Sequence, residues 1–133
     1  MAIRPSSEWR DGTAEEARLV AVGALEQEFA VMEGLFPPDL LQRFDEIFDV
    51  FERDVAGLSV PTDGEVLSLI RNVVYALNAL NEDCDSDAIA TGERTVLCDY
   101  IDRTISEAGV DLDVLSARHG VPREDLTDEW RTW

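Results

Sequence analysis

The sequence predicts an all-α fold, a single-domain bundle of about four main amphipathic helices followed by a C-terminal helical hairpin. Apolar side chains recur at steps of three and four along most of the chain, which is the period of a helix. No alternation of polar and apolar residues is long enough to indicate a sheet. The length of 133 residues, 45% of them hydrophobic, suits one domain over 1–133 that buries a core without disulfides or metal.

The first main helix is expected from Thr13 to about Gly34, because Thr13 and Glu16 have the spacing of a capping box. Its apolar stripe is predicted at helical spacing, comprising Leu19, Val22, Leu25, Phe29 and Met32. Residues 1–12 precede this helix and are expected to form a flexible N-terminal arm. They lack the apolar run of a secretory signal peptide.

The second helix is expected to begin near Pro38 or Asp39, since proline suits a first helical turn, and to end near Gly57. One of its faces is apolar and should face the core, with Leu41, Phe44, Phe48, Phe51 and Val55. The opposite face is acidic and is a candidate interaction surface, with Asp45, Glu46, Asp49 and Glu52.

The third helix should start after Thr62 or Asp63, and its apolar residues cover more than one face. This pattern indicates a central, largely buried helix. The β-branched residues over 73–75 leave a strand open there, but the spacing across 66–80 favours a helix.

A polar loop over 81–90 and a fourth helix, capped by Thr91 and closed by Gly109, should follow. The expected C-terminal hairpin has a short helix capped by Asp111 and ended by Gly120. Its second arm runs from Pro122 to about residue 130. This helix, turn and helix resemble a DNA-binding unit, but the second arm is acidic and would repel phosphates.

The chain is strongly acidic, with 29 Asp and Glu against 11 basic residues, all of them Arg, and a net charge of −18. Such a field repels the phosphates of nucleic acids and the surface of anionic membranes, so neither is an expected partner. It favours a basic protein partner, through steering and complementarity. The alternative is that the acidity is only the compositional background of a GC-rich genome.

No residue pattern indicates catalysis, so no enzymatic activity and no cofactor are expected. His119, the single histidine, suits the last turn of a helix, where a cationic ring complements the helix dipole. Cys98 falls on an apolar stripe and Cys84 in an acidic loop, where its thiol should be unreactive. Two cysteines outside any CxxC spacing suit reduced thiols, and hence a cytoplasmic location. Trp9, Trp130 and Trp133 lie near the two ends of the chain. They either fold back to cap the bundle, which is the preferred interpretation, or stand exposed as contact residues.

The loop after the third helix contains alternating aspartates, and Asp83, Asp85 and Asp87 match positions 1, 3 and 5 of an EF-hand loop. Ala88 stands where that loop needs glycine, and Arg94 where it needs a bidentate glutamate. These aspartates are therefore only weak candidates for a divalent ion, and a solvated turn is the preferred interpretation.

Two asparagines, Asn78 and Asn81, interrupt the third helix, where buried amides need hydrogen-bonding partners. They either fix the shape of the following loop or, with Glu82, line a functional groove.

The segment Leu77–Cys98 reads LNxLNE followed by IxTxERxxLC. It resembles a pattern in small uncharacterised acidic all-helical bacterial proteins, some of the immunity-protein type that accompanies toxins. The resemblance implies an inhibitor that binds a toxin, and it brings no catalytic residues.

The function that these observations favour is a non-enzymatic interaction or inhibitor module that binds a basic partner. Its predicted interaction residues lie on the acidic helix face and in the acidic loop, and comprise Asp45, Glu46, Asp49, Glu52, Asn78, Asn81, Glu82, Asp83, Asp85 and Asp87. The alternatives are a housekeeping or regulatory domain with background acidity, a divalent-metal or enzymatic protein using the loop Glu82–Asp87, and a DNA mimic.

Overall fold

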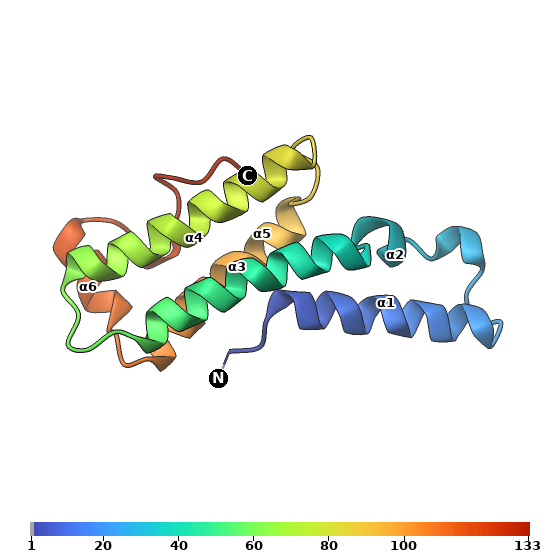
Figure 1. Ribbon diagram of the computed structural model, residues 1–133, viewed down its shortest axis with the longest axis horizontal. Coiled ribbons are helices and arrows are strands. Elements are labelled where there is room, and N and C mark those ends of the chain that lie inside the picture. The colour runs from blue at the N-terminus through green and yellow to red at the C-terminus, as the bar shows by residue number, and fades with distance from the viewer. Residues whose placement is uncertain (1) are drawn as a thin grey trace.

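A computed structural model describes residues 2–133, and over this range the chain is helical with no strand (Figure 1). The predicted all-α, single-domain class is therefore confirmed. The α-helices and the 3-10 helices (η) follow in the order α1 (Pro5–Ala21), η1 (Gln27–Phe29), α2 (Met32–Leu35), α3 (Pro38–Ala56), α4 (Asp63–Asp83), α5 (Thr91–Glu107), α6 (Leu112–His119) and η2 (Arg123–Asp125).

The core lies between α3, α4 and α5. All five residues of the predicted apolar stripe of α3 are buried, and the ring of Phe48 lies 4.8 Å from that of Tyr100 on α5. Helix α4 buries residues on more than one face, as expected of a central helix, and it continues through 73–75, so the strand alternative is wrong. Its buried apolar residues are Val66, Ile70, Val73, Val74, Leu77 and Leu80.

The predicted start of the first helix at Thr13 is wrong, because α1 begins at Pro5. Thr13 sits inside the helix, where its hydroxyl donates to the carbonyl oxygen of Trp9 at 3.0 Å instead of capping. Glu16 accepts from the backbone N–H of Met32 at 2.8 Å, so it ties α1 to α2.

Residues 5–12, expected as part of a flexible arm, instead belong to α1; Met1 lies outside the described residues. Trp9 is only 7% exposed. Its ring stacks on Phe36 with centroids 4.7 Å apart and meets Phe44 edge-on at 5.0 Å. Burial of this large aromatic side chain anchors the first half of α1 on α3.

The first helix also ends earlier than predicted. The N–H of Gly23 donates to Val20 and that of Ala24 to Leu19, the two bonds of a Schellman turn. Gly23 has φ +77°, a conformation that glycine adopts without strain. The chain then turns back through η1 and α2, and Gly34, the expected terminator, lies inside α2.

Helix α5 begins at Thr91 as expected, but Thr91 does not cap it; Ala90 occupies the N-cap and offers no side-chain bond. Helix α6 has the predicted ends. Asp111 accepts from the N–H of Val114 at 3.1 Å, and Gly120 is left-handed with φ +65°.

The prediction of a helix from Pro122 to about residue 130 is wrong, because only the 3-10 turn η2 forms there. The tail after η2 is not helical and runs along α4. Trp133 is 7% exposed and Trp130 is half-buried, so both contribute to packing rather than standing free.

We predict that Trp9→Ala lowers the free energy of unfolding by about 3–5 kcal/mol, because it removes the aromatic side chain that anchors α1 and leaves a cavity beside Phe44. Urea unfolding followed by circular dichroism measures the change. Tyr75→Ala is the control, since the Tyr75 side chain is 51% exposed. Equal losses in the two variants would contradict the anchoring role.

Candidate functional site

Three of the four predicted carboxylates on the acidic face of α3 form ion pairs within the fold, although the Asp49 side chain remains 55% exposed. The guanidinium of Arg4 contacts Asp49 Oδ1 through Nη2 at 2.7 Å and Glu52 Oε2 through Nε at 2.7 Å. It also lies 3.6 Å from Asp45 Oδ1. Arg10 adds a second contact to Asp45, at 2.8 Å. Most carboxylates of the predicted interaction face thus form ion pairs that hold α1 against α3.

Two hydroxyl groups complete this network. Ser6 Oγ donates to Asp45, and Tyr100 Oη donates to Glu52. Partial burial pushes the pKa of Asp45 up, but the hydrogen bonds from Ser6 and Arg10 outweigh it and hold that pKa below its usual value. Burial, reinforced by the bond to Glu52, raises the pKa of the Tyr100 hydroxyl.

Glu46 is the one predicted residue of that face outside the network. It is exposed, and its carboxylate accepts only a 3.5 Å hydrogen bond from Gln42.

Asn78 and Asn81 are buried, with 8% and 4% exposure, so they do not line an open groove. Asn81 Oδ1 accepts from the backbone N–H groups of Ala88 at 3.0 Å and Ile89 at 2.9 Å. It therefore fixes the acidic loop, as one of the two interpretations predicted.

Asn78 reaches the C-terminal tail, which sequence reasoning did not foresee. Its Nδ2 donates to the carbonyl of Trp130 at 2.7 Å, and its Oδ1 accepts from the N–H of Thr132 at 3.2 Å. The tail is thus fastened to the same end of α4 from which the acidic loop departs.

The acidic loop forms a tight turn and not a loop that surrounds an ion. Asp85 has φ +56°, and the backbone N–H of Ser86 donates to the carbonyl of Asn81 at 2.8 Å. Asp83 pairs with Arg43 at 2.7 Å. Across residues 2–133, no group of three or more His, Cys, Asp or Glu gathers as a metal site, so the structure does not bring Asp83, Asp85 and Asp87 together as ligands.

Three carboxylates of the loop remain exposed and form no ion pair within the described part of the chain, namely Glu82, Asp85 and Asp87. The turn geometry and the two bonds to Asn81 hold the backbone that carries them. They are the predicted interaction residues that the structure leaves available.

The tail adds further acid that sequence reasoning did not single out. Partial removal from water, with repulsion from Asp128 and Glu124, raises the pKa of Asp125 above its usual value. Arg131 offsets only part of this charge, through a 2.5 Å contact to Asp128. The charge run over 124–129 was visible in the sequence, but its location beside α4 was not.

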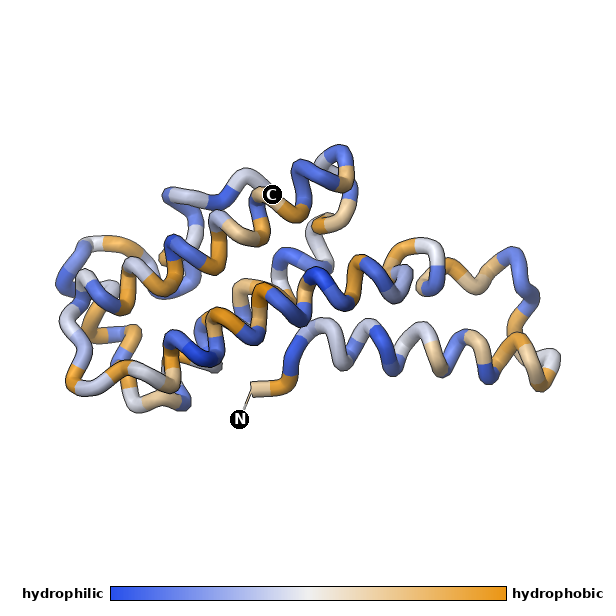
Figure 2. The backbone as a smooth tube through the Cα atoms, viewed as in Figure 1, coloured by the Kyte–Doolittle hydropathy of each residue, from blue (hydrophilic) through white to orange (hydrophobic). Residues whose placement is uncertain are grey.

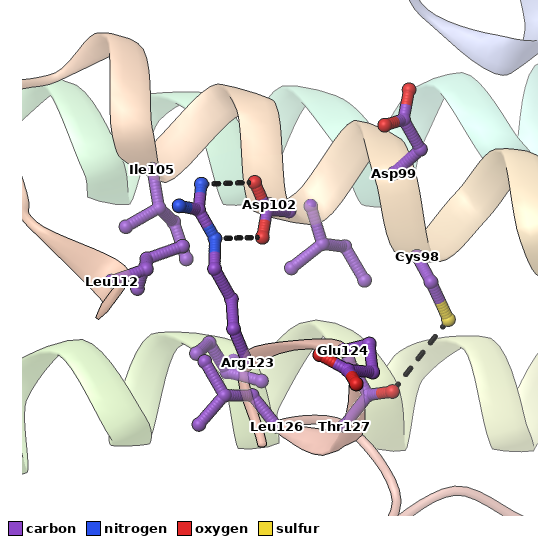
Figure 3. A pocket seen from close by; sticks show the side chains of 11 residues that line it. Cys98, Asp99, Asp102, Ile105, Leu112, Arg123, Glu124, Leu126 and Thr127 are labelled. Carbon is purple, nitrogen blue, oxygen red and sulfur yellow. Dashed lines mark hydrogen bonds and ion pairs between the residues drawn. The ribbon is translucent and has the colours of Figure 1, made fainter. Parts of the chain in front are cut away.

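A hollow of about 260 Å³ lies between α5 and the tail (Figure 3). Its polar groups are paired: Arg123 forks onto Asp102 with two 2.7 Å bonds and also contacts Ser106 at 2.8 Å. The Cys98 sulfur lies 3.6 Å from the hydroxyl of Thr127. The hollow is therefore a packing feature in which Arg123 fastens the tail to α5.

His119 lies at the end of α6, as expected, and faces Asp63 at the start of α4, with Nε2 3.1 Å from Asp63 Oδ2. Arg118 forks onto the same carboxylate at 2.6 and 2.8 Å. The hydrogen bond from Arg118 is the main cause that lowers the pKa of Asp63 to about 2. The cluster joins the ends of two helices.

Comparisons of the chain with protein-family models, with curated proteins and with solved structures find no match. Among residues 2–133, no helix combines the length and the apolar character needed to cross a membrane. Function therefore has to be inferred from geometry and charge.

We predict that Asn81→Ala lowers the free energy of unfolding by about 2–3 kcal/mol, because the buried N–H groups of Ala88 and Ile89 lose their acceptor. Urea unfolding gives the loss, and amide hydrogen exchange at those two groups shows where it arises. Asn72→Ala, at an exposed position on α4, should cost far less. Unchanged exchange at Ala88 and Ile89 would contradict the role of Asn81.

We predict that the stabilisation from Asp63 is lost in acid. Its folded pKa of about 2 lies below the usual 3.8, so its contribution is complete above about pH 5 and vanishes as the pH falls through about 2. The difference in unfolding free energy between the wild type and Asp63→Asn should follow this course. Carboxyl-carbon NMR should show the pKa of Asp63 rising in Arg118→Met. A pKa unmoved in that variant would refute the assigned cause.

Proposed function

We propose that this chain is a non-enzymatic interaction or inhibitor protein, of the immunity-protein type, whose partner is a basic protein. The observation that supports this most is the set of exposed, unpaired carboxylates of the acidic loop, Glu82, Asp85 and Asp87. Negative groups in this state gain by meeting positive groups of a partner, since they form no ion pair with residues 2–133 of their own chain.

The arginines explain why so much acid stays uncompensated. There are only 11 basic residues in the chain. Of these, Arg4, Arg118 and Arg123 form ion pairs that join one helical segment to another. The excess of acidic residues, a net charge of −18, therefore makes the surface potential negative. Such a potential attracts a positively charged partner and repels nucleic acid.

The loop is also built for recognition, because its backbone is held before any partner arrives. Two N–H groups bond to Asn81, and Ser86 bonds back to the carbonyl of the same residue. A surface ordered in advance loses less conformational entropy on binding than a flexible one does.

The resemblance to immunity-type proteins falls on the same unit. Within Leu77–Cys98, the motif positions Leu77, Leu80 and Leu97 are buried core residues, and Asn81 holds the loop. These residues thus maintain a scaffold that displays the loop.

We predict that the triple variant E82Q/D85N/D87N slows association with the basic partner about tenfold at low salt, because long-range attraction is lost. The partner is first captured from a lysate of the source cells at low salt, and association is then measured by surface plasmon resonance. The difference between variant and wild type should shrink at about 0.5 M salt.

The matched control is E8Q/D11N/D54N, which removes the same charge from exposed residues of α1 and α3. It should slow association much less than the loop variant. Equal slowing in both variants would show that only bulk charge matters, and failure to capture any basic protein would favour a domain with background acidity.

A further inference from the structure

The outer half of α1 and the segment after it contribute no fully buried side chain to the core. No residue from Arg10 to Leu35 is buried, although the segment is rich in apolar side chains. Four of these are more than half exposed, with Val22 at 65%, Phe29 at 62%, Val31 at 55% and Leu35 at 52%. We call the segment 22–35 the apolar tip. Exposed apolar residues concentrated in one segment mark an interaction site more often than scattered ones do.

The tip projects beyond the rest of the bundle. The outer half of α1 and η1 extend past the start of α3, away from α4 and α6, and α2 leads back to the start of α3 (Figure 1). The tube coloured by hydropathy shows apolar residues alternating with polar ones out to this end (Figure 2). The Schellman turn at Gly23 and the 2.8 Å bond from Met32 to Glu16 define its shape.

A groove of about 620 Å³ adjoins the tip, between α1, α2 and α3. Small side chains of α1, Ala14 and Ala17, form one wall, and Phe36 and Leu41 lie opposite. Glu33 of the tip also lines it, so the groove and the tip are continuous. Small residues on one wall leave room for a larger apolar side chain to enter.

The charge of this region indicates what fits it. No basic residue occurs between Arg18 and Arg43, whereas Glu26, Glu28 and Glu33 lie within the tip. Arg10 lines the groove, but it is paired there with Asp45 at 2.8 Å. An apolar surface with interspersed carboxylates is complementary to an amphipathic helix that carries Lys or Arg beside its apolar stripe. A second copy of this chain would bring another −18 and three more tip carboxylates against the first, so like charges oppose self-association.

We propose that the apolar tip and its groove form a docking surface for a basic amphipathic helix of a partner protein. The proposal rests on the proposed function only in taking the partner to be basic. It concerns a different surface, which adds apolar anchoring to the charge steering of the acidic loop.

The test uses a synthetic peptide of about 18 Leu and Lys residues, long enough for five helical turns, with the leucines at helical spacing. Isothermal titration calorimetry with the full chain should show saturable binding. The variant F29S/L35S should bind at least about tenfold more weakly, since apolar anchors carry most of the energy of such contacts. An isomeric peptide, with its leucines spread around the helix, should bind the wild type weakly.

The matched control is V50S/Y75S, which removes two apolar side chains of similar exposure from α3 and α4, at 52% and 51%. It should retain peptide binding, as should E82Q/D85N/D87N, which disables only the acidic loop. Circular dichroism checks that every variant is folded. Loss of peptide binding in the loop variant and not in the tip variant would overturn this proposal while leaving the proposed function in place.

Two other results would also overturn it. Equal binding of the isomeric peptide would show that the peptide binds through its overall charge and not through its apolar stripe. Sedimentation showing a dimer of the wild type that F29S/L35S dissolves would identify a second copy as the occupant. Retention of peptide binding in the loop variant, together with failure to capture any basic protein, would count against the proposed function alone.

Discussion

The guanidinium of Arg4 is the contact that decides how the acidic face of α3 is used. It meets Asp45, Asp49 and Glu52, which lie on successive turns of α3, and so determines how α1 lies on that helix. The hydrogen bond with Glu52 is the main cause that raises the pKa of Arg4. Three carboxylates on one helix face repel one another unless a cation intervenes, so the same contact also stabilises α3.

This contact changes which carboxylates remain available to the proposed partner. With Asp45, Asp49 and Glu52 paired within the fold, the loop of Glu82, Asp85 and Asp87 and the tail over 124–129 are two of the places where acidic side chains remain at the surface. Arg4 and Trp9 fix the first half of α1 against α3, whereas the second half is tied to α2 by the bond from Met32 to Glu16 and carries the apolar tip. The acidic loop and the apolar tip are thus displayed at separate places, which suits steering by the loop and apolar anchoring by the tip.

Buried asparagines play a comparable part at the other end of the molecule. An amide in a core is tolerated only when its donors and acceptors are satisfied, and Asn78 and Asn81 achieve this with backbone groups of the tail and the loop. Neither residue needs to touch a partner to matter for binding. Their effect is to hold in place the backbone that carries the exposed carboxylates.

The sequence by itself determined α3, the start of α4 and both ends of α6, because periodicity and caps such as Asp111 are local signals. The start that the sequence predicts for α1 is wrong. The spacing of Thr13 and Glu16 is a local signal for a helix start, but the helix extends back to Pro5 because Trp9 is buried against Phe36, a contact between distant residues.

The use of the acidic residues was decided only by the tertiary structure. Asp45 and Glu52 look like solvent-facing carboxylates from the pattern of α3, yet their partners lie up to 48 residues away in the chain. Local spacing contains no information on which distant arginine will meet a carboxylate. Only the packing of α1 on α3 separates the residues that hold the fold together from those left for a partner.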